Sequence, residues 1–291
     1  MKCSLCPRRC NAERTLTENK NGYCRQSLSP RVARAALHFW EEPIISGKNG
    51  SGTVFFSGCN LGCIYCQNEY ISRLDNGKIV TPERLSEIYR ELENMGAHNI
   101  NLVTPTHFIT AIKESLDIYR PNIPIVYNSG GYESVETIKS LRDYVDIYLV
   151  DYKYIDPLKS GKYSFAADYP DIARKAIDEC YRQKGEAVIT DGIMRQGVIV
   201  RHLLLPRSTE DAIRIFDYVK DNMSSAYFSL MSQYVPIGRA LKDGIINRKI
   251  TKREYDKVVD HIFESGFQNC FIQERTSATD DYIPIFDNRG V

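Results

Sequence analysis

The sequence predicts an α/β protein: a partial (β/α)6 TIM-like barrel preceded by a small N-terminal cysteine-rich metal-binding lobe. Two observations lead to this fold class. From Gly52 onward, short apolar segments alternate with amphipathic segments of helical period, which is typical of parallel strands joined by right-handed helical crossovers. The first 50 residues lack this alternation and carry turn residues and four cysteines instead. We therefore expect a lobe and connector at residues 1–50 and a barrel domain at residues 51–291.

The predicted elements follow one another in strict alternation. Strands are expected at residues 53–57, 99–104, 124–129, 146–153, 198–206 and 226–234, with a further short strand at 268–273. Helices are expected at residues 81–96, after Thr106, from Ser134, at 171–185, from Ser208, and from Thr251 to Gly266. In such barrels the chemistry lies at the carboxyl ends of the strands, so motifs at those ends are the first candidates for a site.

Local signals support several boundaries. Thr81 is a good N-cap with Pro82 at the first helical position, and Thr251 with Glu254 matches a capping box. The Asp191–Gly192 pair within residues 187–196 predicts a β-hairpin extension.

Composition excludes several classes of protein. With 43% hydrophobic and 26% charged residues and a net charge of +1, the chain is typical of a soluble globular protein and has no basic footprint for nucleic acid. No run of eighteen apolar residues predicts a membrane span, and "MKCSLCPRRC" lacks the apolar region of a signal peptide. We therefore expect a cytoplasmic protein, without a membrane partner, whose thiols stay reduced.

Cysteine placement points to metal. Seven of the nine cysteines fall within the first 66 residues, and clustering of this kind in a reducing compartment indicates metal ligands. Cys180 lies in a helical pattern and Cys270 in an apolar strand pattern, where each is expected to be a small buried hydrophobic residue.

The stretch "GCNLGCIYCQN", residues 58–68, holds Cys59, Cys63 and Cys66 directly after the first predicted strand. Three thiolates on one short loop can hold three corners of a cubane iron–sulfur cluster and leave the fourth iron open to another ligand. The alternative is a zinc loop whose fourth ligand, such as a histidine, lies elsewhere in the chain.

The pattern C-x3-C-x-aromatic-C, given by Cys59, Cys63, Tyr65 and Cys66, resembles the hallmark of the radical S-adenosylmethionine (SAM) superfamily. This resemblance implies a 4Fe-4S cluster whose open iron chelates SAM. It also implies that the reduced cluster cleaves SAM to a 5′-deoxyadenosyl radical, which abstracts hydrogen from a substrate.

Further motifs, "NLVTPTHF", "YNSGGYE", "LVDYKY" and "RHLLLP", look like the pyruvate formate-lyase activating enzymes and their PflX-like relatives. That resemblance implies a glycine of a glycyl-radical enzyme as substrate and a flavodoxin- or ferredoxin-type electron donor. The PflX-like branch is favoured because the additional cysteines precede the SAM motif.

The same resemblance implies SAM contacts at the strand ends. The residues concerned are Tyr65, Thr104, His107, Asn128, Ser129, Asp151, Lys153 and Arg201. Asp151 and Lys153 share one face of their strand, and a structural ion pair is the alternative for them. For His107 the alternative is a helix-terminal residue without a ligand. Arg201 is expected to face the barrel interior and an anionic group, while the neighbouring His202 packs elsewhere.

Four further cysteines, Cys3, Cys6, Cys10 and Cys24, have the spacing C-x2-C-x3-C-x13-C. Four thiolates make a closed ligand set, which suits either structural zinc or an auxiliary iron–sulfur cluster. The connector "ALHFWEEP", residues 36–43, either covers the barrel mouth or places a packing tryptophan beside solvated carboxylates.

The sequence thus favours a radical SAM enzyme, with a glycyl-radical enzyme as the first choice of substrate. A small molecule, a peptide or RNA is the alternative substrate. A metal-binding or electron-carrying protein without catalytic activity is the remaining alternative.

Overall fold

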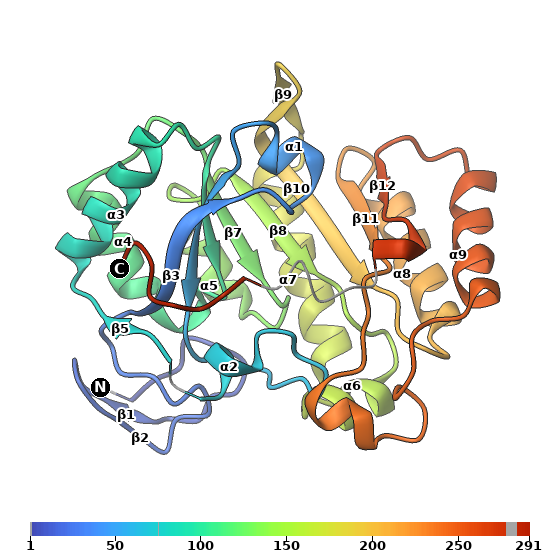
Figure 1. Ribbon diagram of the computed structural model, residues 1–291, viewed down its shortest axis with the longest axis horizontal. Coiled ribbons are helices and arrows are strands. Elements are labelled where there is room, and N and C mark those ends of the chain that lie inside the picture. Colours follow the sequence, from blue (N-terminus) through green and yellow to red (C-terminus); the bar gives the residue numbers. More distant parts are fainter. Residues whose placement is uncertain (1, 75, 278–283) are drawn as a thin grey trace.

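The computed structural model describes residues 2–74, 76–277 and 284–291, and its centre is a mostly parallel β-sheet (Figure 1). Seven neighbouring strands are parallel. In spatial order they are β4 (Ser51–Phe56), β6 (Ile100–Val103), β7 (Ile125–Ser129), β8 (Ile147–Asp151), β10 (Ile193–Leu203), β11 (Tyr227–Met231) and β12 (Cys270–Ile272). This arrangement agrees with the predicted α/β class and with an open, partial barrel.

Three more strands extend the sheet with antiparallel pairing. β3 (Arg31–His38) pairs with β4, β5 (Lys78–Ile79) pairs with β3, and β9 (Val188–Thr190) pairs with β10. The β9–β10 pair is the hairpin predicted at Asp191–Gly192, and it makes β10 longer at its start than expected. β3 was not predicted, and "RVARAALH" shows no regular polar–apolar alternation. β3 belongs to the main sheet although it precedes the expected domain boundary at residue 50. That boundary stays a prediction.

The longer helices cover the outer face of the curved sheet (Figure 1). The longer ones are α3 (Pro82–Asn94), α4 (Ile109–Ile118), α7 (Tyr169–Lys184), α8 (Thr209–Asn222) and α9 (Lys252–Glu264). The shorter ones are α1 (Pro43–Ser46), α2 (Glu69–Ser72), α5 (Val135–Lys139), α6 (Pro157–Ser164) and the 3-10 turns η1 (Thr106–Phe108), η2 (Gly238–Lys242) and η3 (Arg275–Ser277). The Thr81 cap and the Thr251–Glu254 capping box are confirmed. No helix in the described ranges is long and apolar enough to cross a bilayer.

Strand alternation divides the sheet into an outer and an inner face. On β8, Tyr148 and Val150 pack outward into the core beneath α7 and α8. Ile147 and Leu149 point inward and pack around Ile45 of α1, which fills the interior near the amino ends of the strands. Asp151 follows on the same inner face at the carboxyl end. The interior is therefore apolar at one end and polar at the end where a site is expected.

Two terminal segments cover other parts of the sheet. The N-terminal lobe, with the short strands β1 (Glu13–Arg14) and β2 (Asn19–Lys20), lies at the same end of the molecule as α2 (Figure 1). Residues 288–289 add backbone hydrogen bonds along β3, where Asn288 N–H donates to Ala33 and Ala35 N–H donates to Arg289. This addition protects an exposed strand edge.

Candidate active site

The cysteine loop begins two residues after β4, at the carboxyl edge of the sheet. Gly58 and Gly62 have φ angles of 84° and 102°, a backbone region that favours glycine. A β-carbon on Gly62 would lie 1.6 Å from an Arg73 nitrogen, so the loop also needs glycine for close approach. The Gly58 N–H donates to the carbonyl of Ile71 in α2, which fixes the start of the loop. Local backbone chemistry therefore sets the shape of the loop.

The three thiols of this loop lie close together, with Cys63 buried and Cys59 and Cys66 partly buried. Burial raises the pKa of Cys59 and raises that of Cys66 to about 12, with the neighbouring loop thiols adding to both shifts. The Cys63 sulfur accepts a hydrogen bond from Ser164 at 2.9 Å. Ser164 in turn bonds Tyr154 at 2.7 Å, and Tyr154 bonds Tyr65 at 2.6 Å. The Tyr65 hydroxyl is thus engaged behind Cys63.

These residues fit an iron–sulfur cluster in their chemistry. The loop offers three soft thiol ligands, of which Cys63 and Cys66 line a cavity, and buried thiolates need a cation for compensation. Among the described residues, no three histidine, cysteine or acidic side chains converge on a single ion. Each cysteine of a cubane holds a different iron, so a cluster does not require such convergence.

A cavity of about 400 Å³ connects the loop with the barrel interior. Cys63, Tyr65 and Cys66 line its mouth, and Glu41, Glu42 and Pro43 line its inner end. Its strand walls are formed by Phe55, Val103, Asn128, Asp151, Lys153, Arg201, Leu203, Ser229, Met231, Gln233, Phe271, Ile272 and Gln273. Of the predicted SAM contacts, Tyr65, Asn128, Asp151, Lys153 and Arg201 lie together around this cavity.

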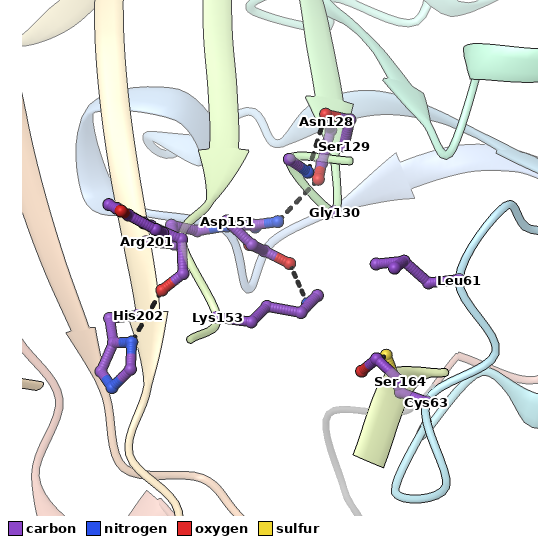
Figure 2. A network of polar contacts seen from close by, with 12 residues as sticks. Leu61, Cys63, Asn128, Ser129, Gly130, Asp151, Lys153, Ser164, Arg201 and His202 are labelled. Carbon is purple, nitrogen blue, oxygen red and sulfur yellow. Dashed lines mark hydrogen bonds and ion pairs between the residues drawn. The ribbon is translucent and has the colours of Figure 1, made fainter. Parts of the chain in front are cut away.

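Arg201 is the centre of a buried polar network in the cavity. Its Nε donates to Asp151 at 2.9 Å, its Nη1 to Glu41 at 3.0 Å, and its Nη2 to Asn128 at 2.7 Å. Asp151 also pairs with Lys153 at 2.5 Å, on the side that faces the cysteine loop (Figure 2). The planar guanidinium uses its fork geometry to hold groups from three parts of the chain in one arrangement.

Charge controls protonation in this network. Burial alone would raise the pKa of Asp151, but the Arg201 and Lys153 cations lower it below its usual value. Burial opposes the charge of Lys153 too, yet Asp151 and the Cys63 thiol raise the pKa of its ammonium. Lys153 is therefore held as a cation between the network and the cysteine loop. The predicted interior face of Arg201 is observed, while His202 points away and its Nδ1 contacts the Tyr152 carbonyl at 2.8 Å.

The connector differs from the expectation of solvated carboxylates. Glu41 and Glu42 point into the barrel interior because β3 carries the connector to the amino ends of the strands, where α1 begins. Glu41 accepts from Asn101, Asn128 and Arg201, and its side chain is only 10% exposed. Glu42 is 8% exposed, and its Oε2 has no hydrogen-bond partner among the described residues. Burial raises the pKa of both carboxyls.

Three predicted SAM contacts lie outside the cavity lining. The His107 Nε2 contacts the Ser57 carbonyl at 2.7 Å, and burial lowers its pKa to about 3. Ser129 accepts from the Gly131 N–H at 3.3 Å. Thr104 has a φ of 58°, which is strained for a β-branched residue and marks the end of β6. Their contacts with SAM stay predictions that rest on resemblance.

Several site residues were not predicted from the sequence. Ser164 and Tyr154 support Cys63 from α6 and the loop before it, and Ser229 and Met231 face the cavity from β11. The inward positions of β11 follow from alternation, so that signal was present. The two glutamates gave none, because a pair of acidic residues after an aromatic one is most often exposed.

The N-terminal cysteines lie near one another in the lobe. Burial raises the pKa of Cys6 to about 12 and raises that of Cys24, and nearby Cys3 adds to both shifts. Cys10 is exposed. The donor set fits a metal in kind, although no three ligands converge on one ion in the described chain. The other two cysteines are structural: Cys180 is buried in α7 as expected, while Cys270 in β12 is only partly buried.

Comparison with known proteins identifies the family. The family model described as "Radical SAM superfamily" matches residues 53–219. An uncharacterized protein of Methanocaldococcus jannaschii, MJ0674, is 30% identical over 268 residues, covering 89% of this chain and 73% of that protein. The chain belongs to the radical SAM superfamily, whose enzymes use a 4Fe-4S cluster and SAM and need a reductant.

A solved structure supports the fold, and another gives a weaker match. SuiB of Streptococcus suis, solved with its precursor peptide SuiA, matches with a TM-score of 0.50 at 13% identity, over 74% of this chain and 46% of SuiB. The hydrogenase maturase HydG of Carboxydothermus hydrogenoformans matches with a TM-score of 0.47 at 14% identity, over 77% of this chain and 54% of HydG. This chain therefore spans about half the length of these proteins.

Proposed function

We propose that this radical SAM enzyme abstracts a hydrogen atom from a glycine of a partner polypeptide, as an activating enzyme for a glycyl-radical protein. The observation that carries the proposal is the cavity, which joins two of the three loop thiols, Cys63 and Cys66, to a buried ionic network. When bound, the cluster and SAM together supply a 5′-deoxyadenosyl radical. A low-potential donor of the flavodoxin or ferredoxin type provides the electron.

Residues of this chain have distinct tasks in that proposal. Cys59, Cys63 and Cys66 hold the cluster. Lys153, held as a cation near Cys63, offers its ammonium to a carboxylate at the mouth of the cavity. Arg201 keeps Asp151 ionised and oriented, so this carboxylate can accept a hydrogen bond from an amino or hydroxyl group. The apolar floor around Ile45 closes the inner end of the cavity against water.

A polypeptide substrate is favoured by the open side of the sheet. β12 pairs with β11 and has no pairing with β3 or β5 in the described chain. The cavity lining includes His38 and Trp40 beside β3 and Phe271 and Ile272 on β12, so it reaches both borders of this open seam. An extended loop can enter there without opening a closed barrel.

Two anaerobic measurements test the proposal. Wild-type protein and a Cys59/Cys63/Cys66→Ala variant are compared for iron and sulfide content and, after reduction with SAM present, for 5′-deoxyadenosine. We expect the variant to lose about four irons and all of the product. Wild-type protein that binds no iron and leaves SAM intact contradicts the radical chemistry.

The glycine step needs its own test. A glycyl-radical enzyme is produced in cells supplied with α-dideuterated glycine and is then mixed with the reduced protein and SAM. The expected results are deuterium in 5′-deoxyadenosine, by mass spectrometry, and a glycyl signal in electron paramagnetic resonance. Product formation without deuterium transfer contradicts the glycine substrate and leaves SAM cleavage intact.

A cationic small molecule is the second candidate substrate, and Glu42 favours it. The carboxylates of Glu41, Glu42 and Asp151 line the cavity with two cations, Arg201 and Lys153, and both cations are already paired. The surplus carboxylate, Glu42, has an oxygen without a partner and suits an ammonium or guanidinium group. Amines that protect the wild type but not a Glu42→Gln variant against heat denaturation would support this candidate.

A further inference from the structure

The carbonyl of Leu61 is held by three side chains at the middle of the spacer between Cys59 and Cys63. The Tyr23 hydroxyl, the Arg73 Nη2 (2.7 Å) and the Arg8 Nη2 (3.4 Å) all donate to it. Two of the three donors come from the N-terminal lobe. The cysteine loop is therefore fixed from outside the barrel as well as by its own glycines.

Arg8 makes the more extensive of these contacts. Its Nε donates to the Asn60 carbonyl at 2.7 Å, and its other nitrogens reach the carbonyls of Phe165 (2.5 Å) and Ser164 (3.2 Å). Ser164 is the residue whose hydroxyl donates to the Cys63 sulfur. The guanidinium also stacks on the Tyr23 ring, 4.0 Å from its centre. One side chain thus joins the cysteine loop to the end of α6.

Arg8 and Tyr23, the two residues of the lobe that donate to the Leu61 carbonyl, both lie beside cysteines of the lobe. Arg8 falls between Cys6 and Cys10, and Tyr23 directly precedes Cys24. Side-chain donors also point at the lobe sulfurs: Arg14 lies 3.5 Å from Cys3, and Asn19 lies 3.8 Å from Cys24. Such donors commonly surround metal-bound thiolates. A metal bound by the lobe cysteines would therefore fix the backbone beside Arg8 and Tyr23, the two lobe residues that contact the cysteine loop.

The lobe has too little apolar core to hold these anchors by itself. Between residues 2 and 28, the buried apolar residues are Ala12 and Cys24, and the strands β1 and β2 have two residues each. Arg9 and Asn11 are among its residues with positive φ, which adds strain. Small units of this kind depend on a disulfide or a metal for stability.

We propose that Cys3, Cys6, Cys10 and Cys24 bind a metal centre that holds Arg8 and Tyr23 against the cysteine loop. The thiolate-bound metal is zinc or an iron–sulfur cluster, and its task is to position the loop that carries the SAM-binding cluster. The inference rests on the radical SAM function of that loop but not on the identity of the substrate. Arg8 is a positioning residue that also places a cation beside an anionic cluster.

The test compares variants by metal content, cluster retention and reduction potential, with no substrate present. Cys10→Ser/Cys24→Ser removes the lobe metal, while Arg8→Met and Tyr23→Phe leave its ligands in place. Arg8→Lys keeps the charge but loses the fork. Arg9→Met is the matched control, because the Arg9 side chain is exposed and lies between the same two cysteines.

In anaerobic protein, we expect the cysteine pair to lose zinc or the extra iron and to release its remaining cluster iron to a chelator about tenfold faster than wild type. Arg8→Met should keep the lobe metal, release cluster iron about tenfold faster, and shift the midpoint potential to a more negative value. Arg8→Lys should release iron as fast as Arg8→Met but keep the midpoint potential of the wild type, because it keeps the charge. Tyr23→Phe should show a smaller increase in iron release, and Arg9→Met should behave as wild type.

Wild-type iron release and potential in all variants, with circular dichroism showing folded protein, overturn the clamp. Wild-type protein with no metal at the lobe overturns the metal site. Iron in excess of four atoms identifies a second cluster, whereas zinc identifies a structural centre, and either supports the proposal. Wild-type protein without any cluster contradicts the proposed function itself, so the two failures are distinguishable. If Arg8→Met does not fold, the comparison of Tyr23→Phe with Arg9→Met decides.

Discussion

The two walls of the cavity differ in whether their buried charges are paired. The wall formed by β7, β8 and β10 pairs its charges, because Arg201 joins Asp151, Asn128 and the inserted Glu41. The wall formed by β11 and β12 offers Ser229, Met231, Gln233 and Phe271, and the Glu42 carboxylate keeps an unpartnered oxygen in the described structure. The paired wall keeps its shape without a ligand, whereas the carboxylate of the other wall bears a desolvation cost that a ligand can relieve.

Breaking the paired wall should have the largest effect. Arg201→Met leaves Glu41 buried without a cation and Asp151 with Lys153 alone, so we expect the free energy of unfolding to fall by about 3–5 kcal/mol. Urea denaturation measures this loss. Arg214→Met on the exposed face of α8 is the control and should change stability by less than about 0.5 kcal/mol. A loss of less than about 1 kcal/mol for Arg201→Met would mean that water enters and solvates the two carboxylates.

Glu133 is a second buried carboxyl, on the outer face of the same wall. Its hydrogen-bond donors are hydroxyl groups, whereas those of Asp151 are cations. Thr106 donates to Glu133 at 2.6 Å and Tyr127 at 3.1 Å. Burial raises its pKa to about 7. The folded protein therefore binds a proton that the unfolded chain releases near pH 4.5, and stability falls as pH rises between these values.

The effect of Glu133 is measurable against Glu133→Gln, which mimics the protonated acid. The stability of wild type relative to this variant should fall by about 3 kcal/mol from pH 4.5 to pH 7 and stay constant above. Asp151 should contribute with the opposite sign at lower pH, because its lowered pKa makes its stabilising charge disappear as acid is added. A constant difference between wild type and variant over this range would show that Glu133 is not buried in solution.

The sequence predicted those parts of the site that depend on local spacing. Cys59, Cys63 and Cys66 were identified by their spacing. Alternation allowed only one of Arg201 and His202 to face the interior, and the planar fork of arginine favoured Arg201. The partners of Arg201 gave no such signal: Glu41 is separated from it by 160 positions, and only the path of β3 brings it into the interior. "RVARAALH" gave no clear strand signal, because its polar and apolar residues do not alternate, and the place of β3 in the sheet depends on pairing with β4.

Resemblance was informative where residues match and less so where they differ. Asp151 and Lys153 occupy the cavity as the family pattern implies, and they also form the ion pair considered as the alternative. The His107 ring contacts the Ser57 carbonyl outside the cavity, and its predicted contact with SAM stays a prediction. A motif indicates the strand on which a residue lies, whereas its surroundings depend on distant segments. Arg14 of the N-terminal lobe, for example, donates to the backbone carbonyl of His107 at 2.7 Å.

The smallest expected effect separates the two adjacent glutamates. Glu41→Gln weakens charge-assisted hydrogen bonds from Arg201, so the free energy of unfolding at pH 8 should fall by about 2 kcal/mol. Glu42→Gln replaces a buried carboxylate that has an unpartnered oxygen, so its stability should stay within about 1 kcal/mol of wild type or exceed it. Urea denaturation of both variants without ligand measures the difference. Equal losses would show that Glu42 has a cation partner in solution, and the surplus charge that favours a cationic substrate would then be absent.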